Sequence, residues 1–575
     1  MMRTAAEKPA LAVPLRPPDL VMRLPRLGAF HQTRLSFMRA LLRRLKRDDW
    51  AFERTLWRMD EKGNGVAIYQ AGGTERTYSL IAFANDLDLA KRSDRVIAQE
   101  WDATFVLYDG VPDEADLERL AQNVPKQEAG RLSERELSLS RANRSVRLFD
   151  HIRACLAAGR QPEAAELDRA GYVMRTTAVY GNAKFGASDR DRIAGRPEFA
   201  APFQAELLSV YLIRSFTFDI LDHMAEADAP GAAVRLAPDL RRRLGVGNST
   251  GLGMAPFIVN HPSLLNNWIL ARETALARIR SLPRARHREI RHFRAIVARQ
   301  RHGADLWSTG HAGQAARIVE YRADLARLDA HIDRGGEDIL AGARPWDALY
   351  RWAEKNLTLE GQESLVGLLL EPYGDRVDDL ADTMSADESA CFDIDGGMTI
   401  GGMRATLRAI HGPGLETDFT DKAQSARFWY ASEEKLEPRL GERYAEAGSA
   451  REHPLATLRD AAALWRDSLA LKGRAPVAEL LLRHPEHRHS VRRVQIARAH
   501  AYSEIRGNLI AADLQPIDLL RCKLSFFGAM RFDPRSDRWV RITLFQYAPL
   551  PDDFALCADA AAVDDWAYAP LEPPS

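Results

Sequence analysis

The spacing of hydrophobic residues changes along this chain, and that change restricts the folds open to it more than any other feature. Residues 65–85, GVAIYQAGGTERTYSLIAFAN, carry two β-rich runs on either side of a Gly-Gly turn, and residues 103–110, ATFVLYDG, add a third. Near the other end, aromatic and β-branched residues flank a loop in residues 523–548, KLSFFGAMRFDPRSDRWVRITLFQYA. These patterns predict hairpins at both ends of the chain, and the two could join one sheet.

Helical spacing dominates the rest of the chain. Apolar residues recur at this spacing in residues 35–57, where Arg and Lys stand between them, and again in several stretches after residue 199. We therefore predict an α+β fold that is predominantly α-helical, with antiparallel strands or hairpins near the N-terminal third and the C-terminus packed with a large helical body. The helix over 35–57 is expected to pack its apolar stripe on its own domain rather than on a membrane.

Length and composition indicate several structural parts. The chain has 575 residues, more than one hydrophobic core usually holds. We expect an extended Pro-rich arm in residues 1–28, an N-terminal α+β region in residues 29–198, a helical region with a Gly-rich loop in residues 199–350, and a mainly helical region ending in a β-hairpin in residues 351–575. The chain shows no repeat of fixed period, which argues against a solenoid.

Charge and cysteine content restrict the function classes. Lys plus Arg and Asp plus Glu number 80 each, so no overall field favours nucleic acid or an acidic membrane. The four cysteines form no CxxC pair, a pattern typical of reduced thiols in the cytoplasm, and no apolar run is long enough to span a bilayer. We predict a soluble, cytoplasmic protein without a nucleic-acid or membrane partner. Whether it forms a homo-oligomer stays open.

A Gly-rich stretch, GVGNSTGLGMAPFIVNHPSLLNNW at residues 245–268, is the first candidate for a binding site. Its glycine spacing matches neither the dinucleotide motif nor Walker A, and we expect a structured loop whose glycines let a ligand approach the backbone. A helix that starts at Leu252 would offer free N–H groups to an anion. The alternative is a helix cap with a tight turn. The candidate ligand-binding residues are Gly247, Asn248, Ser249, Thr250, Gly251, Gly253 and Asn260.

Two residues near this stretch could carry acid–base or charge chemistry. His261 follows it and can exchange a proton near neutral pH. A second loop, residues 179–192, carries Lys184 between two glycines, with Asn182 and Arg190 as further ligand-binding candidates. His261 and Lys184 are the candidate catalytic residues; a hydrogen-bonded structural histidine and a solvated polar turn are the alternatives. The sequence does not say whether the two loops meet in space.

Three other stretches are interpreted without a catalytic role. Asp393 and Asp395 would share one face of a strand, where a divalent metal is conceivable, but exposed acidic residues before a turn are the favoured interpretation. HPEHRH, residues 484–489, is interpreted as an exposed basic segment, so no metal ligand is assigned. The Arg-rich residues 278–302 are expected to form a helix with an inward apolar stripe rather than to bind RNA.

Together these features predict an enzyme that acts on a small anionic organic substrate. The Gly-rich loop would supply backbone donors, Lys184 and Arg190 the counter-charge, and His261 an acid or base. Glycine density favours redox chemistry with a flavin or nicotinamide nucleotide over lyase or group-transfer chemistry, although the cofactor stays undetermined. The alternative is a non-catalytic interaction or regulatory protein that uses its helical surface and exposes a large apolar patch.

Overall fold

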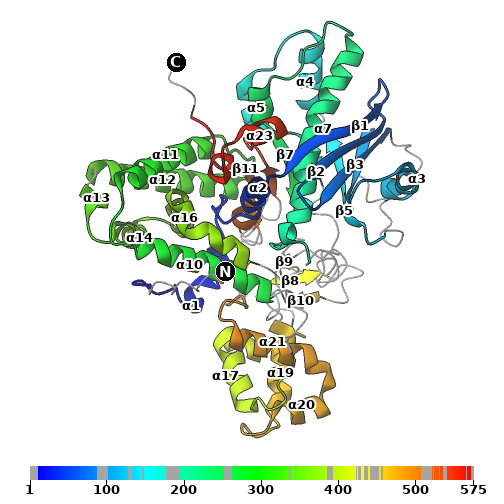
Figure 1. Ribbon diagram of the computed structural model, residues 1–575. Helices are drawn as coiled ribbons and strands as arrows, with labels where there is room; N and C mark the ends of the chain where they lie inside the picture. Colours follow the sequence, from blue (N-terminus) through cyan, green and yellow to red (C-terminus); the bar gives the residue numbers. More distant parts are fainter. Residues whose placement is uncertain are drawn as a thin grey trace, which may run out of the picture.

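The structure, a computed structural model, has an α+β fold in which helices predominate, as predicted (Figure 1). A large body combines one long sheet with most of the helices, and a smaller helical body lies below it in the view of Figure 1. The described residues are 11–86, 101–126, 133–145, 148–176, 195–250, 262–335, 338–384, 393–421, 424, 429–432, 438–440, 452–454, 458–506, 521, 523–529, 531–534, 540–564 and 566–571.

Nine strands form the main sheet, and both predicted hairpins belong to it. The order is β1-β2-β3-β4-β5-β6-β7-β12-β11, and all neighbours are antiparallel except β6 and β7. The expected union of the N- and C-terminal hairpins in one sheet is therefore confirmed. The strands are β1 (Ala51–Met59), β2 (Gly65–Gly72), β3 (Thr77–Asp86), β4 (Trp101–Asp109), β5 (Glu136–Arg144), β6 (Tyr172–Thr176), β7 (Gly245–Thr250), β11 (Arg531–Pro534) and β12 (Val540–Leu544).

Different helices cover the two faces of the sheet, because successive side chains of a strand point to opposite sides. Leu80 of β3 belongs to the large core that includes the buried face of α7 (Gln204–Asp228), the long helix across the sheet in Figure 1. Ile81, its neighbour in the chain, points the other way and packs with Leu120 of α3 (Glu114–Asn123).

The prediction of a helix over residues 35–57 is correct only for the first part of this range. α2 spans Phe37–Arg47, and residues from Ala51 onward form β1. Asp49 between them has a φ of 52°, a left-handed conformation that ends the helix. The expected burial of the apolar stripe is confirmed, since Leu41 and Leu42 are fully buried.

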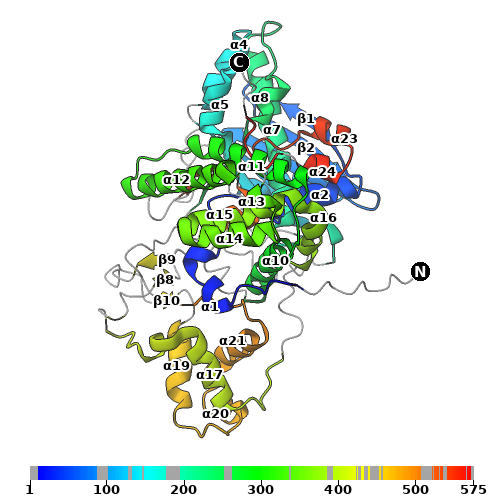
Figure 2. The same cartoon turned by 90° about the vertical axis from the view of Figure 1, so that its left-hand side faces the viewer.

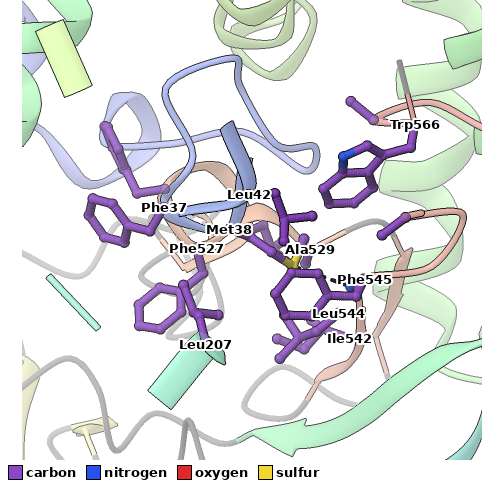
Figure 3. Close-up of a cluster of buried hydrophobic side chains, with 14 of the residues drawn as sticks. Phe37, Met38, Leu42, Leu207, Phe527, Ala529, Ile542, Leu544, Phe545 and Trp566 are labelled. Atoms are coloured by element: carbon purple, nitrogen blue, oxygen red, sulfur yellow. Dashed lines mark hydrogen bonds between the residues drawn. The ribbon is translucent and has the colours of Figure 1, made fainter. Parts of the chain in front are cut away.

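The described part of the predicted N-terminal arm, residues 11–28, is partly buried in the large body. It contains α1 (Pro18–Val21) and a short 3-10 helix, Leu24–Arg26. Val21 and Leu27 are fully buried. They belong to a single hydrophobic core whose members come from all four predicted parts of the chain. Figure 3 shows this mixing: Met38 and Leu42 of α2 lie beside Phe545 from the C-terminal part, and Phe37 of α2 lies beside Phe527.

A layer of helices packs beside the sheet (Figure 2). The Arg-rich residues 278–302 do not form one helix, because α10 ends at Arg280 and α11 begins at His287, with Pro283 in the break. The helices of this layer are α10 (Pro262–Arg280), α11 (His287–Asp305), α12 (Ala312–Gly335), α13 (Asp338–Ala341), α14 (Pro345–Asn356), α15 (Leu359–Leu370) and α16 (Gly374–Val377), with the 3-10 turns Glu371–Tyr373 and Asp378–Thr383.

The smaller body has its own hydrophobic core, which includes Ile400, Leu464 and Val491. Its helices are α17 (Ile400–His411), α19 (Leu458–Ser468), α20 (Val477–Arg483) and α21 (Arg488–Ala499), and a three-stranded sheet precedes α19 with β8 (Trp429–Ser432), β9 (Pro438–Leu440) and β10 (Glu452–Pro454). Tyr502, after α21, joins the two bodies: its OH donates to the carbonyl of Arg16 at 2.7 Å.

Short helices complete the large body: α4 (Leu148–Ala157), α5 (Ala164–Ala170), α8 (Pro238–Arg242), α23 (Pro551–Leu556) and α24 (Ala560–Val563). Among the helices that the structure describes, none has the combination of length and apolar character needed to cross a membrane.

Candidate functional site

The first six residues of the Gly-rich stretch form a strand, contrary to the predicted loop. Residues Gly245–Thr250 form β7, between β6 and β12. A Cβ on Gly245 would lie 2.2 Å from the carbonyl oxygen of Leu544, and one on Gly247 would lie 2.6 Å from the ring of Tyr172. Glycine is therefore needed here for close packing against the chain itself.

The other candidate residues of the two predicted loops fall into two groups. Asn248 is buried, and its Nδ2 donates to the carbonyl of Thr176 at 2.8 Å; Ser249 and Thr250 complete β7. Outside the described residues lie Asn182, Lys184, Arg190, Gly251, Gly253, Asn260 and His261. Their ligand-binding and catalytic roles stay predictions.

The structure does relate the starting points of the two predicted loops. β6 and β7 are parallel neighbours, with Tyr172 opposite Gly245. Their carboxyl ends, Thr176 and Thr250, therefore point to the same edge of the sheet. Residues 177–194 and 251–261, which follow these strands in the sequence, lie outside the described residues, but the strands that precede them end at this common edge.

A cleft of about 1130 Å³, which sequence analysis missed, lies between α2, α11 and the chain around residues 371–379 and 559–568. We call it the α2–α11 cleft. Five arginines and seven carboxylates line it, so electrostatics dominates its chemistry. They are Arg34, Arg39, Arg43, Arg288, Arg299, Glu289, Glu371, Asp375, Asp378, Asp379, Asp559 and Asp564; His292 and Tyr568 also contribute.

The floor of the cleft is a buried network of ion pairs. Arg39 is almost fully buried, and its guanidinium lies 2.7 Å from Glu371 and 2.8 Å from Asp564. Arg43 reaches Asp564 at 2.9 Å, and Arg34 reaches Asp378 at 2.7 Å. Each guanidinium thus meets a carboxylate at close range, which offsets the cost of removing both from water.

The arginines also control the ionisation of their partners. Burial alone would raise the pKa of Asp564, but Arg39, Arg43 and Arg34 outweigh it and hold that pKa well below its usual range. The pKa of Glu371 is lowered in the same way, with burial opposed by Arg39 and Arg34. Both carboxylates therefore stay charged at neutral pH.

One wall of the cleft is cationic. Arg288, His292 and Arg299 lie on one face of α11 and line the cleft. Arg299 donates to the carbonyl of Ala569 at 3.2 Å. Arg288 is exposed and has no hydrogen bond or ion pair to any residue that the structure describes. It can therefore meet a ligand.

Several of the carboxylates are already engaged by the protein. Besides Glu371, Asp378 and Asp564 on the floor, Asp379 lies 2.7 Å from Arg278, which points in from outside the cleft. Glu289 accepts from the hydroxyl of Tyr373 at 2.9 Å. The excess of carboxylates in the lining thus does not make the cleft a cation site, because most of them are balanced or hydrogen-bonded from within.

A neutral histidine lies behind the floor. The His31 ring stacks on Tyr568 with centroids 4.6 Å apart, and the Tyr568 hydroxyl donates to Glu371 at 3.2 Å. Burial lowers the pKa of His31 to about 4, so the imidazole is neutral at pH 7. It borders a void of about 10 Å³, together with Gln300 and Tyr321, which is close to the minimum space for one water molecule.

The remaining two sequence interpretations are corrected in part. Asp395 is not on a strand: its Oδ1 accepts from the backbone N–H of Gly397 at 2.8 Å in a turn. This turn agrees with the favoured interpretation of acidic residues before a turn. The segment 484–489 is not exposed throughout, because His487 is buried and its Nε2 lies 2.6 Å from Asp467 Oδ2.

Comparison with protein family models, with curated proteins and with solved structures gives no match for this chain. No relative therefore supplies a function for the cleft, and its chemistry follows from its own side chains. The exposed guanidinium of Arg288 on the cleft wall can pair with an anionic group.

Proposed function

We propose that the protein is an enzyme that binds a small organic anion in the α2–α11 cleft and acts on it. The observation that carries this proposal is the placement of Arg288 on the cleft wall, exposed and without a described partner, beside His292 and Arg299 on the same face of α11. A guanidinium binds a carboxylate or phosphate with two parallel hydrogen bonds. The volume of about 1130 Å³ is large enough for a metabolite-sized molecule.

The proposed reaction remains redox chemistry with a flavin or nicotinamide nucleotide, in preference to lyase or group-transfer chemistry, in a cytoplasmic protein. A second candidate site for the anion or for that cofactor lies at the edge where β6 and β7 end. Parallel strands that end together provide the usual place for a ligand in an open sheet. Lys184, Arg190 and His261 would act there, in the roles that the sequence suggests.

Ligand screening with a matched pair of variants tests the cleft. Mono- and dicarboxylates and phosphomonoesters are the probes, and thermal shift and calorimetry are the readouts. We expect at least one probe to bind the wild type saturably, and Arg288→Gln to weaken it about tenfold or more, as loss of a charge-assisted pair implies. Arg291→Gln is the control, since Arg291 is an exposed arginine of the same helix outside the cleft lining.

Two results would contradict the proposal: equal binding in both variants, or no saturable binding by any probe. Native and denaturing mass spectrometry of the purified protein, with an absorption spectrum, tests the cofactor. A released nucleotide mass or a flavin band supports redox chemistry. A mass equal to that of the bare chain, without a chromophore, would exclude a tightly bound cofactor. If the probes that bind are not converted to product, the alternative of a non-catalytic interaction protein is favoured.

A further inference from the structure

Four potential metal ligands meet at one corner of the smaller helical body. Asp467 lies near the end of α19, His484 follows α20, and Glu486 and His487 lie in the turn that leads into α21. One ligand atom from each residue can be chosen so that all four lie within 4.8 Å of one another. The end of α19 and the turn between α20 and α21 thus bring four potential ligands to one place.

The distances within the cluster are close to those of a metal site. Asp467 Oδ2 lies 2.6 Å from His487 Nε2 and 3.9 Å from His484 Nδ1, while Glu486 Oε1 lies 3.1 Å from that Nδ1. Tetrahedral zinc with bonds of about 2.0–2.1 Å places its ligand atoms about 3.3 Å apart. To hold such an ion, Asp467 and His487 would move apart and the more distant ligand atoms would approach one another.

The charge of the cluster also favours a cation. Asp467 and Glu486 bring two carboxylates to the cluster. Arg466, Arg483 and Arg488 each adjoin one of the four residues in the sequence, but within the described residues none of them forms an ion pair with the cluster; Arg483 instead lies 2.5 Å from Glu479. A divalent ion would balance the charge of the two carboxylates and replace the present contacts, Asp467 with His487 and Glu486 with His484, by four bonds to the metal.

We propose that Asp467, His484, Glu486 and His487 bind one divalent transition-metal ion of the zinc class. Two imidazole ligands select such ions over Mg²⁺ and Ca²⁺, which prefer oxygen. The ion joins the end of α19 to the corner between α20 and α21. Its role is structural, because the small core of this body, with members such as Leu464 and Val491, gains stability from a cross-link between helices.

The site escaped the sequence interpretation for an identifiable reason. HPEHRH holds three of the ligands, and without Asp467 it offers no closed ligand set. Asp467 is 20 positions from His487 in the sequence. Only the packing of α19 against the chain after α20 brings its carboxylate to the two imidazoles.

Zinc binding by the full-length protein tests the proposal. After chelator treatment and desalting, the protein is titrated with ZnCl₂, and bound metal and thermal unfolding are measured. The wild type should bind one more equivalent of Zn²⁺ than His484→Gln, and Zn²⁺ should raise its Tm, whereas MgCl₂ should not. His489→Gln, which changes an exposed histidine outside the cluster, should behave as the wild type.

A variant of a second proposed metal-binding residue distinguishes the loss of a ligand from misfolding. Glu486→Gln alters an exposed side chain, so the variant is expected to fold, and it should weaken Zn²⁺ binding about tenfold, in the range seen when metal-site residues are lost. The absorption spectrum of the Co²⁺ form should change between the wild type and this variant. Equal Zn²⁺ content in the wild type and His484→Gln, or equal stabilisation by Mg²⁺ and Zn²⁺, would overturn the proposal.

Discussion

Arg39 and Asp564 lie 525 positions apart in the sequence, yet their side chains form a buried ion pair, with Nε 2.9 Å from Oδ1 and Nη2 2.8 Å from Oδ2. This pair ties α2 to the C-terminal part of the chain and forms the floor of the α2–α11 cleft. A bidentate contact of this kind fixes the orientation of both groups as well as attracting them.

Removal of the Asp564 charge should strongly destabilise the protein. In Asp564→Asn, Arg39 and Arg43 lose a buried partner, and breaking one side of such a pair costs about 3–5 kcal/mol. Urea unfolding followed by tryptophan fluorescence measures the loss. The control is Asp382→Asn, because Asp382 is exposed where it pairs with Arg44 and should matter by less than about 1 kcal/mol. Similar losses in both variants would contradict this account of the floor.

His31 should make the protein sensitive to mild acid. Its pKa is about 4 in the folded protein, owing to burial, against 6.5 for the free side chain. Between these values the unfolded chain binds the extra proton, so the stability from His31 is complete above pH 6.5 and falls as the pH drops towards 4. The shift corresponds to about 3 kcal/mol.

The comparison with His31→Gln isolates this effect from that of the many carboxylates. The glutamine cannot titrate, and its amide can still donate to the carbonyl of Gln32, which His31 Nδ1 contacts at 3.1 Å. Urea unfolding of both proteins at pH 7.5 and 4.5 should show the wild type losing more stability than the variant on acidification. Parallel losses would mean that His31 is protonated in the folded state.

Gly247→Ala should lower stability, because its Cβ would lie 2.6 Å from Cγ of Tyr172. Cγ is at the base of the ring and moves little without the backbone, so the clash should cost roughly 1–3 kcal/mol. Thermal unfolding measures it. Gly310→Ala is the control, since a Cβ there meets nothing within 4 Å. An unchanged Tm in Gly247→Ala would show that packing against Tyr172 does not require glycine at this position, and ligand binding would be left as the proposed reason for it.

Arg16 should hold the N-terminal segment in place. Its guanidinium is buried between Glu273 and Glu363, at 2.7 and 2.8 Å. In Arg16→Met both carboxylates lose a buried partner, and we expect cleavage by chymotrypsin within residues 11–28 to accelerate at least tenfold. Arg23→Met, at an exposed arginine of the same segment, should leave the rate close to that of the wild type. Equal rates would show that hydrophobic packing alone retains the arm.

Sequence patterns predicted elements whose cause is local. The hairpin in residues 65–85 follows from alternating side chains around a Gly-Gly turn, and β2 and β3 occupy those positions. The prediction of one helix over residues 35–57 was wrong at Asp48 and Asp49, because apolar residues continue at helical spacing on both sides of this break. Periodicity alone does not reveal that one residue there takes a left-handed conformation.

The sequence by itself determined the fold class and the position of both hairpins, because backbone preference and side-chain periodicity depend on near neighbours in the chain. Only the tertiary structure decided that Gly245 and Gly247 lie in a strand against Leu544 and Tyr172. It alone also placed the α2–α11 cleft. The charges that build its floor attract one another through space, and nothing in the local pattern around Arg39 specifies a partner 525 residues away.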